Sequence, residues 1–347
     1  MRARVAGLLS WIVATVSLCA CSSGFVPPDI LRSPRGGGFQ VTPVSAMITD
    51  CREPRTARTP TKIRIQYFGT STLFISDGVT HLMVDAFLTR PSKAALLGPV
   101  EPDVAKISRV LRTAGIGCLD AILVSHSHFD HALDSGAAAL ITGAAIHGST
   151  STENLLYGQG FGDARFERLD VSREFAVGAF SVQAIPTPHS EREFARGDIQ
   201  APPTRPIYAW DMRTGASYSF RISHPSAIVL VVPGARVDME EQVAMKCADV
   251  TFLGIARLGM QSKADTRTLW DRWVTHPHAS LVGPVHWDDF SQPLAPTLEP
   301  LPFPIDRMDV TSERLEKLAR HDDVGVVFLR PFRVYELVSS SEKTGCR

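Results

Sequence analysis

The chain has 347 residues, which is enough for one large domain with a buried core. Lys and Arg together number 36, as do Asp and Glu, so no overall basic character indicates a nucleic-acid partner. Hydrophobic residues make up 44% and charged residues 21%, which excludes a disordered chain and is typical of a globular protein.

The first twenty residues form a segment of their own. Arg2 and Arg4 precede an apolar run over residues 5–18. The run is too short for a membrane-spanning helix, and the order of charge and hydrophobicity is typical of a secretory signal peptide. We therefore expect residues 1–20 to be a signal peptide.

The residues after this run are Leu18-Cys19-Ala20-Cys21-Ser22, and they resemble a bacterial lipobox. The resemblance implies cleavage before Cys21 and a lipid on that cysteine. The protein would then be anchored to a membrane of the cell envelope, and Ser22 favours the periplasmic face of the outer membrane. A plain signal peptide and an uncleaved anchor are the alternatives.

Residues 22–60 are rich in Pro, Gly, Ser, Thr and Arg, and their few apolar residues recur at no regular period. This composition predicts a flexible tether over 21–61, between the lipid and a folded domain over 62–338.

Four cysteines remain beyond the lipobox, namely Cys51, Cys118, Cys247 and Cys346. An oxidising compartment permits disulfides, including one between Cys51 and Cys346, and free buried thiols are the alternative. None of the four has the close spacing of a structural zinc site.

The elements of the domain follow from the hydrophobic periodicity. Strands are predicted at 63–67, 72–76, 80–85, 119–125, 144–147, 168–169, 180–185, 217–222, 227–232, 250–253, 280–284 and 325–329. Helices are predicted at 102–114, 132–142, 239–247, 265–274 and 312–320. Strands and helices interleaved in one continuous pattern indicate a single α/β domain.

A dense group of metal-binding side chains follows the predicted strand at 119–125. His126, His128, Asp130 and His131 lie within six positions. A lone histidine is more often a surface or core residue than a ligand, but three with an aspartate in so short a stretch are not explained that way. Imidazole and carboxylate groups suit Zn²⁺, and also Mn²⁺ or Fe²⁺.

The pattern His-x-His-x-Asp-His after a hydrophobic strand resembles the signature of the metallo-β-lactamase superfamily. Residues 67–75 and 83–85 resemble the opening strands of that family, and 187–189 and 283–290 resemble its later motifs, each with a histidine after a strand. The resemblance spans residues 62 to about 330 and implies an α/β fold, the four-layer αββα sandwich.

The resemblance also implies two metal sites, with three ligands each. The first set is His126, His128 and His189, and the second is Asp130, His131 and His286. We expect one or two Zn²⁺ ions as the cofactor.

Other residues receive supporting roles. By resemblance, Asp85 would bond a ligand histidine and fix its tautomer, although a turn or capping role is the alternative. Trp287 and Asp288 follow a predicted ligand, and we expect them to line the pocket. The proline-containing segment 190–216 is expected to cover the site.

One position departs from the family pattern. The aspartate that usually bridges the two metals corresponds here to Ala235, which cannot bind a metal, and Asp238 has the wrong spacing to replace it. Without an anionic bridge two cations repel more strongly, so we expect one tight metal or two of unequal affinity.

The function implied is hydrolysis by a metal-activated hydroxide, with Asp130 as ligand and proton acceptor. The substrate would be a small molecule or a lipid-like compound with an ester or phosphodiester bond. A β-lactam or lactone hydrolase and a non-catalytic metal-binding envelope lipoprotein are the alternatives.

Overall fold

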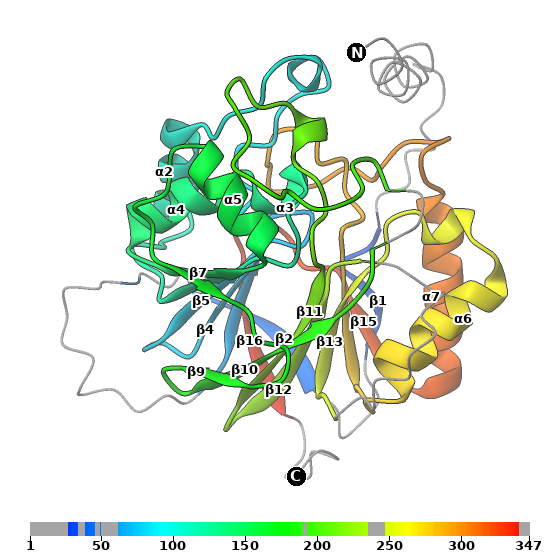
Figure 1. The fold of residues 1–347 in the computed structure, drawn as a ribbon. Coiled ribbons are helices and arrows are strands. Elements are labelled where there is room, and N and C mark those ends of the chain that lie inside the picture. The colour runs from blue at the N-terminus through cyan, green and yellow to red at the C-terminus, as the bar shows by residue number, and fades with distance from the viewer. Residues whose placement is uncertain are drawn as a thin grey trace.

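The computed structural model describes residues 27–33, 39–45, 49, 62–189, 193–234 and 247–339. In these ranges two eight-stranded sheets lie face to face, and helices cover their outer faces (Figure 1). The arrangement confirms the predicted α/β sandwich of four layers.

The first sheet has the strand order β2-β16-β3-β4-β5-β6-β7-β8. Its strands are antiparallel from β2 to β5 and parallel from β5 to β8. Helices α2, α4 and α5 lie on its outer face (Figure 1). The strands are β2 Phe39–Val44, β16 Val334–Ser339, β3 Arg64–Tyr67, β4 Leu73–Ser76, β5 His81–Val84, β6 Ala121–Leu123, β7 Ala145–Gly148 and β8 Phe166–Arg168. The helices are α2 Val104–Thr113, α3 Phe129–Ala132, α4 Ser135–Thr142 and α5 Thr150–Gly158.

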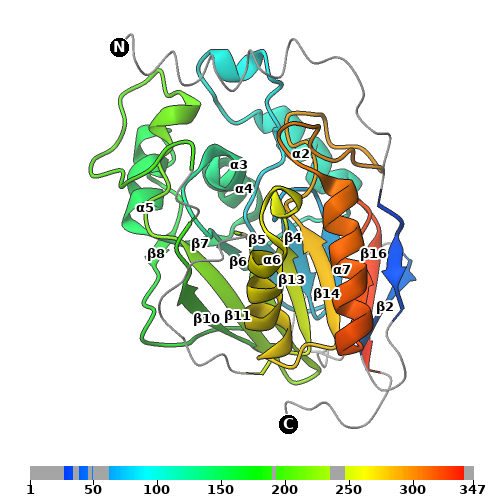
Figure 2. The same cartoon turned by 90° about the vertical axis from the view of Figure 1, so that its right-hand side faces the viewer.

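The second sheet has the order β1-β15-β14-β13-β12-β11-β10-β9. Strands β12 to β15 are parallel, and α6 and α7 cover their outer face (Figure 2). The strands are β1 Ile30–Arg32, β15 Gly325–Val327, β14 Leu281–Val285, β13 Val250–Gly254, β12 Ala227–Val232, β11 Tyr218–His224, β10 Phe180–Pro186 and β9 Phe175–Val177. The helices are α6 Lys263–Trp270, which continues as a π-helical turn over Asp271–Thr275, and α7 Met308–Asp322.

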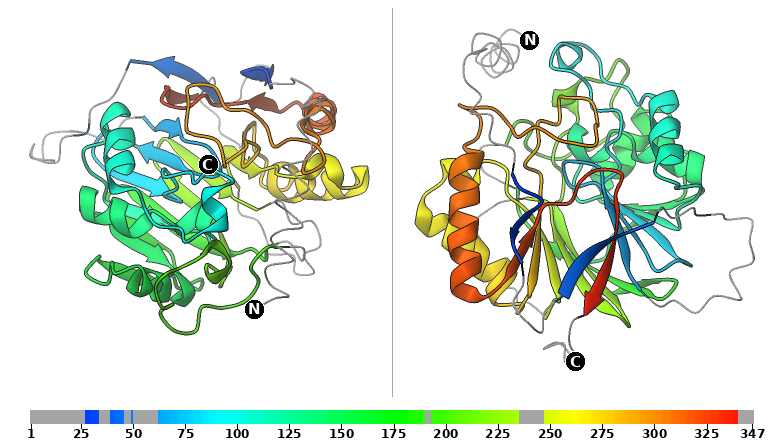
Figure 3. Two further views of the ribbon diagram at one scale, coloured as in Figure 1. Left: turned by 90° about the horizontal axis from the view of Figure 1, so that it is seen from above. Right: turned by 180° about the vertical axis from the view of Figure 1, so that it is seen from behind.

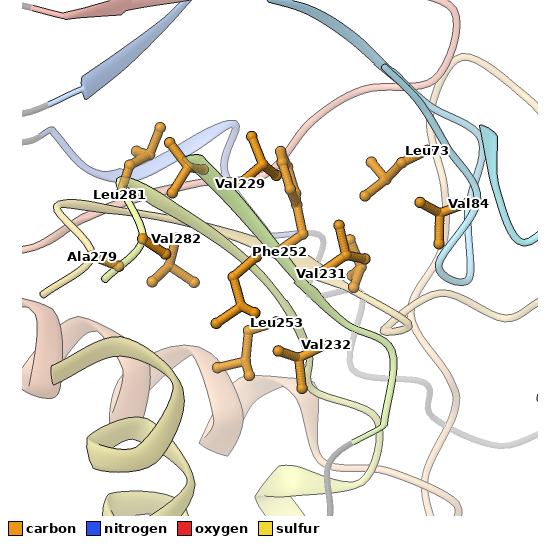
Figure 4. Packing of buried hydrophobic residues seen from close by; sticks show 14 of the residues in the cluster. Leu73, Val84, Val229, Val231, Val232, Phe252, Leu253, Ala279, Leu281 and Val282 are labelled. Atoms are coloured by element: carbon orange, nitrogen blue, oxygen red, sulfur yellow. The ribbon is translucent and has the colours of Figure 1, made fainter. Parts of the chain in front are cut away.

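Alternation along the strands divides the apolar side chains between two cores. Leu73 and Val84 point between the sheets and belong to the same cluster as Val231 and Phe252 (Figure 4). Phe74, next to Leu73 in β4, belongs instead to the core beneath α2 and α4. Because the side-chain period of a strand is two, neighbours in one strand serve different layers. The two cores fix the strand ends from which the site is built.

Two strands lie within the segment predicted to be a flexible tether, and that prediction is wrong for them. Strand β1 pairs with β15, and all six residues of β2 pair with β16 (Figure 3). Both are short or contain a proline, so their hydrophobic alternation is weak in the sequence. They are ordered by backbone pairing with distant strands.

Several elements escaped the sequence analysis. Helix α5 begins with a capping box at Ser149 and Thr152, and strands β9 and β16 carry mixed polarity. The strand predicted at 168–169 corresponds to β8, which begins two residues earlier. The predicted helix at 239–247 lies outside the described residues, except for residue 247.

Cys118 and Cys247 are each disulfide-bonded, so the free-thiol alternative is wrong for these two. Cys51, Cys346 and the lipobox lie outside the described residues. None of the helices in the described ranges combines the length and apolar composition that crossing a bilayer requires.

Candidate metal centre

Three strand ends converge at one end of the sandwich. The chain leaves β6 before His126, leaves β10 before His189 and leaves β14 directly before His286. The structure brings the six predicted ligands together in two groups, and within each group the ligand atoms lie within 4.8 Å of one another. The groups are His126 with His128 and His189, and Asp130 with His131 and His286.

In the first group, His126 Nε2 and His128 Nδ1 face each other at 3.1 Å. The ring of His189 lies 4.8 Å from both of the other rings. His128 Nε2 lies 3.1 Å from the carbonyl oxygen of Ala195 and 3.1 Å from Thr214 Oγ1. A carbonyl oxygen only accepts, so Nε2 of His128 carries the proton and Nδ1 presents a lone pair.

A carboxylate outside the predicted set stands behind His189. Glu193 Oε2 lies 2.9 Å from His189 Nδ1, and the glutamate side chain is only 6% exposed. Burial raises the pKa of Glu193, but hydrogen bonds with His189 and Thr214 outweigh burial and lower it. The carboxylate therefore fixes the proton on Nδ1, so that Nε2 of His189 presents its lone pair. The only sequence signal was a glutamate four residues after a predicted ligand.

In the second group, too, a carboxylate lies behind a ligand histidine. His131 Nε2 lies 3.2 Å from His286 Nε2, and Asp130 Oδ2 lies 3.3 Å from the latter atom. On the far side of the ring, His131 Nδ1 lies 2.8 Å from Asp85 Oδ2. A carboxylate at that distance holds the proton on Nδ1, so Nε2 again presents its lone pair.

Asp85 is placed behind a ligand histidine, where the resemblance put it. It is fully buried with a left-handed backbone at φ 47°. Its carboxylate also accepts hydrogen bonds from Ser71 Oγ at 2.5 Å and from the backbone N and Oγ of Ser125, both at 2.7 Å. These bonds leave the carboxylate one orientation, and so they hold the ring of His131.

His286 is held in place by a buried hydrogen-bond network that includes Asp288, a residue predicted to line the pocket. Its backbone is left-handed at φ 55°, and its N–H donates to the carbonyl oxygen of Thr70 at 2.5 Å. Asp288, two residues on, accepts from the backbone N of Thr70 at 2.7 Å and from Tyr67 at 3.0 Å. Its other oxygen bonds Arg90 at 2.6 Å, and both side chains of this ion pair have no exposed surface.

The expectation that Trp287 and Asp288 line the pocket is therefore wrong. Asp288 is fully buried, and Trp287 is 4% exposed and packs edge-on against Phe328 in the core between the sheets. The two residues that follow His286, whose backbone is left-handed, are thus buried in the protein interior.

The electrostatics suit a cation. Burial, together with the nearby His189, lowers the pKa of His128 to about 4. Burial raises the pKa of Asp130, but the neighbouring His131 and the hydrogen bond from His286 hold it well below the usual range. At neutral pH His128 is therefore a neutral imidazole, and the second group contains an ionised carboxylate. Imidazole lone pairs that converge, on rings whose N–H groups point outward, fit a divalent metal, and so does the ionised carboxylate beside them.

A cavity of about 530 Å³ adjoins the first group. His189 and Glu193 form part of its lining, together with Arg196, Pro188 and Tyr218. Such a volume suits a small-molecule ligand. The described part of the predicted covering segment touches the site, since Ala195 and Thr214 contact His128. Ala235 and Asp238 lie outside the described residues.

The fold and the site together define a class of protein: an αββα sandwich with two sets of metal-binding side chains at one end of its strands. Residues 66–213 match the family model of the metallo-beta-lactamase superfamily. Over these residues the chain is similar to that superfamily.

Individual proteins match this chain over a limited length or at low sequence identity. A UPF0173 metal-dependent hydrolase of Myxococcus xanthus is 31% identical over 118 residues, which cover 34% of this chain and 36% of the relative. Among solved structures, the metallohydrolase Igni18 of Ignicoccus hospitalis aligns with 82% of this chain and 100% of its own, at 15% identity and a TM-score of 0.48. The diiron β-hydroxylase CmlA of Streptomyces venezuelae aligns with 81% of this chain and 55% of its own, at 15% identity and a TM-score of 0.49.

Proposed function

We propose that the protein is a metal-dependent hydrolase that cleaves an ester or phosphodiester-type bond. The observation that carries the proposal is the convergence of two three-residue ligand sets, in which the second ring nitrogen of His128, His131 and His189 faces an acceptor oxygen. We assign the first metal to His126, His128 and His189, and the second to Asp130, His131 and His286. Zn²⁺ is the metal that we expect.

A bound divalent metal would supply an acidified water molecule and polarise the scissile bond. Around it, the chain supplies orientation. Asp130 stays ionised and is the acceptor for the proton of the attacking water. Asp85 and Glu193 hold His131 and His189 in their donor tautomers. We assign no catalytic role to a serine or cysteine nucleophile.

The cavity beside His189 supports a substrate with both an anionic and an apolar part. Arg196 lines it, and its guanidinium group suits a phosphate or carboxylate oxygen. Pro186, Pro188 and Tyr218 line the same cavity and offer apolar surface. This combination favours a phosphodiester with an apolar substituent over a purely polar substrate.

We also propose that the protein is a lipoprotein, anchored through Cys21 at the periplasmic face of the outer membrane. The apolar run over 5–18 and the lipobox support the anchor. Disulfides at Cys118 and Cys247 support an oxidising compartment outside the cytoplasm.

The test is turnover of bis-p-nitrophenyl phosphate and p-nitrophenyl acetate by the full chain. We expect turnover by the wild type and at least a hundredfold loss in His128→Ala. The control is His321→Ala, because the side chain of His321 is 76% exposed and lies outside both ligand groups. We expect this variant to match the wild type.

A chain that binds metal but hydrolyses neither compound, nor any member of a broad ester and phosphodiester panel, would contradict the proposal. That result would favour a non-catalytic metal-binding lipoprotein. Turnover that survives in His128→Ala would remove the metal centre from the reaction.

A further inference from the structure

The described residues begin at the same end of the sandwich as the metal centre. Strands β14 and β15 are parallel neighbours. His286 follows the end of β14, and Phe328 follows the end of β15. The backbone N–H of Phe328 donates to the carbonyl oxygen of Asp29 at 2.8 Å, and Arg330 bonds the Asp29 side chain. Asp29 is thereby fixed at the strand ends that carry the metal ligands.

The distance from this point to the predicted lipid is short. Cys21 and Pro27, the first described residue, are six residues apart (27 − 21 = 6). Six residues span at most about 22 Å when fully extended. The tether predicted over 21–61 would have allowed the domain to turn freely, but pairing of β1 with β15 shortens it to these few residues.

The loops at this end also expose apolar side chains. Leu97 is 50% exposed, Met260 44% and Phe303 57%. They lie in the loops that follow β5, β13 and β14, all at their metal-binding ends. Figure 2 shows the loop between β5 and α2 and the loop between β14 and α7 at one end of the molecule. Phe194, 40% exposed, lies beside Ala195, which contacts His128.

We propose that this end of the sandwich faces the lipid bilayer, with Leu97, Phe194, Met260 and Phe303 as an apolar rim that touches the membrane surface. The inference rests on the proposed lipid at Cys21. Side chains of this type enter the interfacial region of a bilayer. The mouth of the metal centre then opens toward the membrane, so its substrate is a lipid or a compound held at the lipid surface.

The test is photo-crosslinking of the full lipidated chain in vesicles of phosphatidylethanolamine and phosphatidylglycerol. A benzophenone amino acid replaces Leu97, Met260 or Phe303 in turn. Matched controls replace Leu140 and Tyr157, which are 54% and 55% exposed but lie at the carboxyl-terminal parts of α4 and α5. We expect at least fivefold more lipid adduct at the three rim positions than at the controls.

A second arm inserts twenty Gly and Ser residues after Ser23. The longer tether should lower the rim adducts severalfold. Either of two crosslinking results would overturn the inference: equal amounts of lipid adduct at rim and control positions, or crosslinks to a second copy of the chain in place of lipid. It would also be overturned if the insertion left the adducts unchanged, or if Cys21 carried no lipid. Crosslinking does not need turnover. An active hydrolase without rim adducts therefore refutes only the orientation, and an inactive protein with rim adducts refutes only the proposed reaction.

Discussion

Arg90 and Asp288 form an ion pair of 2.6 Å without exposed surface, and through it two loops of the metal centre are held together. Asp288 lies two residues after His286, and its carboxylate also binds the backbone of Thr70, whose carbonyl oxygen accepts from the backbone of His286. Thr70, Arg90 and His286 all have left-handed backbones, at φ 48°, 47° and 55°. Such conformations are costly for these residues and persist because the network over-determines them.

Asp288→Asn should therefore weaken both the fold and the second metal site. It leaves the guanidinium of Arg90 buried without its counter-charge, which costs about 3–5 kcal/mol of unfolding free energy. Denaturant unfolding and metal titration measure the two effects.

The control for this variant is Asp309→Asn. Asp309 pairs with Arg307 at 2.8 Å, and both side chains are more than 40% exposed. Loss of an exposed pair changes stability by at most about 1 kcal/mol. If Asp288→Asn were as stable as the control and bound two metals normally, Asp288 would have no role in positioning His286.

Glu193→Ala should weaken the first metal site without unfolding the protein. Loss of an outer carboxylate behind a ligand histidine lowers metal affinity by roughly 10–100-fold. The metal affinity of Glu193→Gln should lie between those of Glu193→Ala and the wild type, because the amide oxygen still accepts a hydrogen bond from His189 Nδ1. Competition with a chromophoric chelator measures the affinities.

Glu153→Ala is the matched control, since this glutamate lies on α5 and pairs with Arg168. Its metal affinity should equal that of the wild type. An unchanged affinity in Glu193→Ala would mean that the contact with His189 does not support metal binding.

The metal-free protein should lose stability as the pH falls from about 6.5 toward 4. In the folded state burial holds the pKa of His128 at about 4, whereas an unfolded histidine titrates near 6.5. Between these values only the unfolded chain takes up the proton, so acidification favours unfolding. Urea unfolding at pH 7, 6, 5 and 4.5 measures the slope.

His128→Gln removes the titrating group and should flatten this part of the profile. If the wild type and His128→Gln had the same dependence on pH between 6.5 and 4.5, the burial of a neutral His128 would be contradicted.

The sequence predicted those parts of the site that are local or follow a strand end. His126 to His131 lie within six positions directly after a buried strand, so they are close in space because they are close in sequence. His189 and His286 were found only through resemblance, because nothing local distinguishes a lone histidine. Glu193 was missed because a glutamate in a polar loop has no periodicity to mark it.

The long-range partners were not predictable from one sequence. Arg90 meets Asp288 across 198 positions, and Tyr67 meets it across 221. Both contacts exist because Tyr67 ends β3 and Arg90 follows β5 in one sheet, whereas Asp288 follows β14 in the other. The hydrophobic pattern of a single strand contains no information about how two sheets pack together. Strand β2 was missed for a similar reason, since its order comes from pairing with β16 at the far end of the chain.

The most direct test of the two ligand sets is the metal content of the full chain, titrated with Zn²⁺ after chelation and measured by mass spectrometry of the metal, beside His128→Ala and His131→Ala. We predict two equivalents taken up in two steps of unequal affinity by the wild type, and loss of a different single step in each variant. A wild type that binds no metal, or two variants that each bind as the wild type does, would contradict the assignment of the centre.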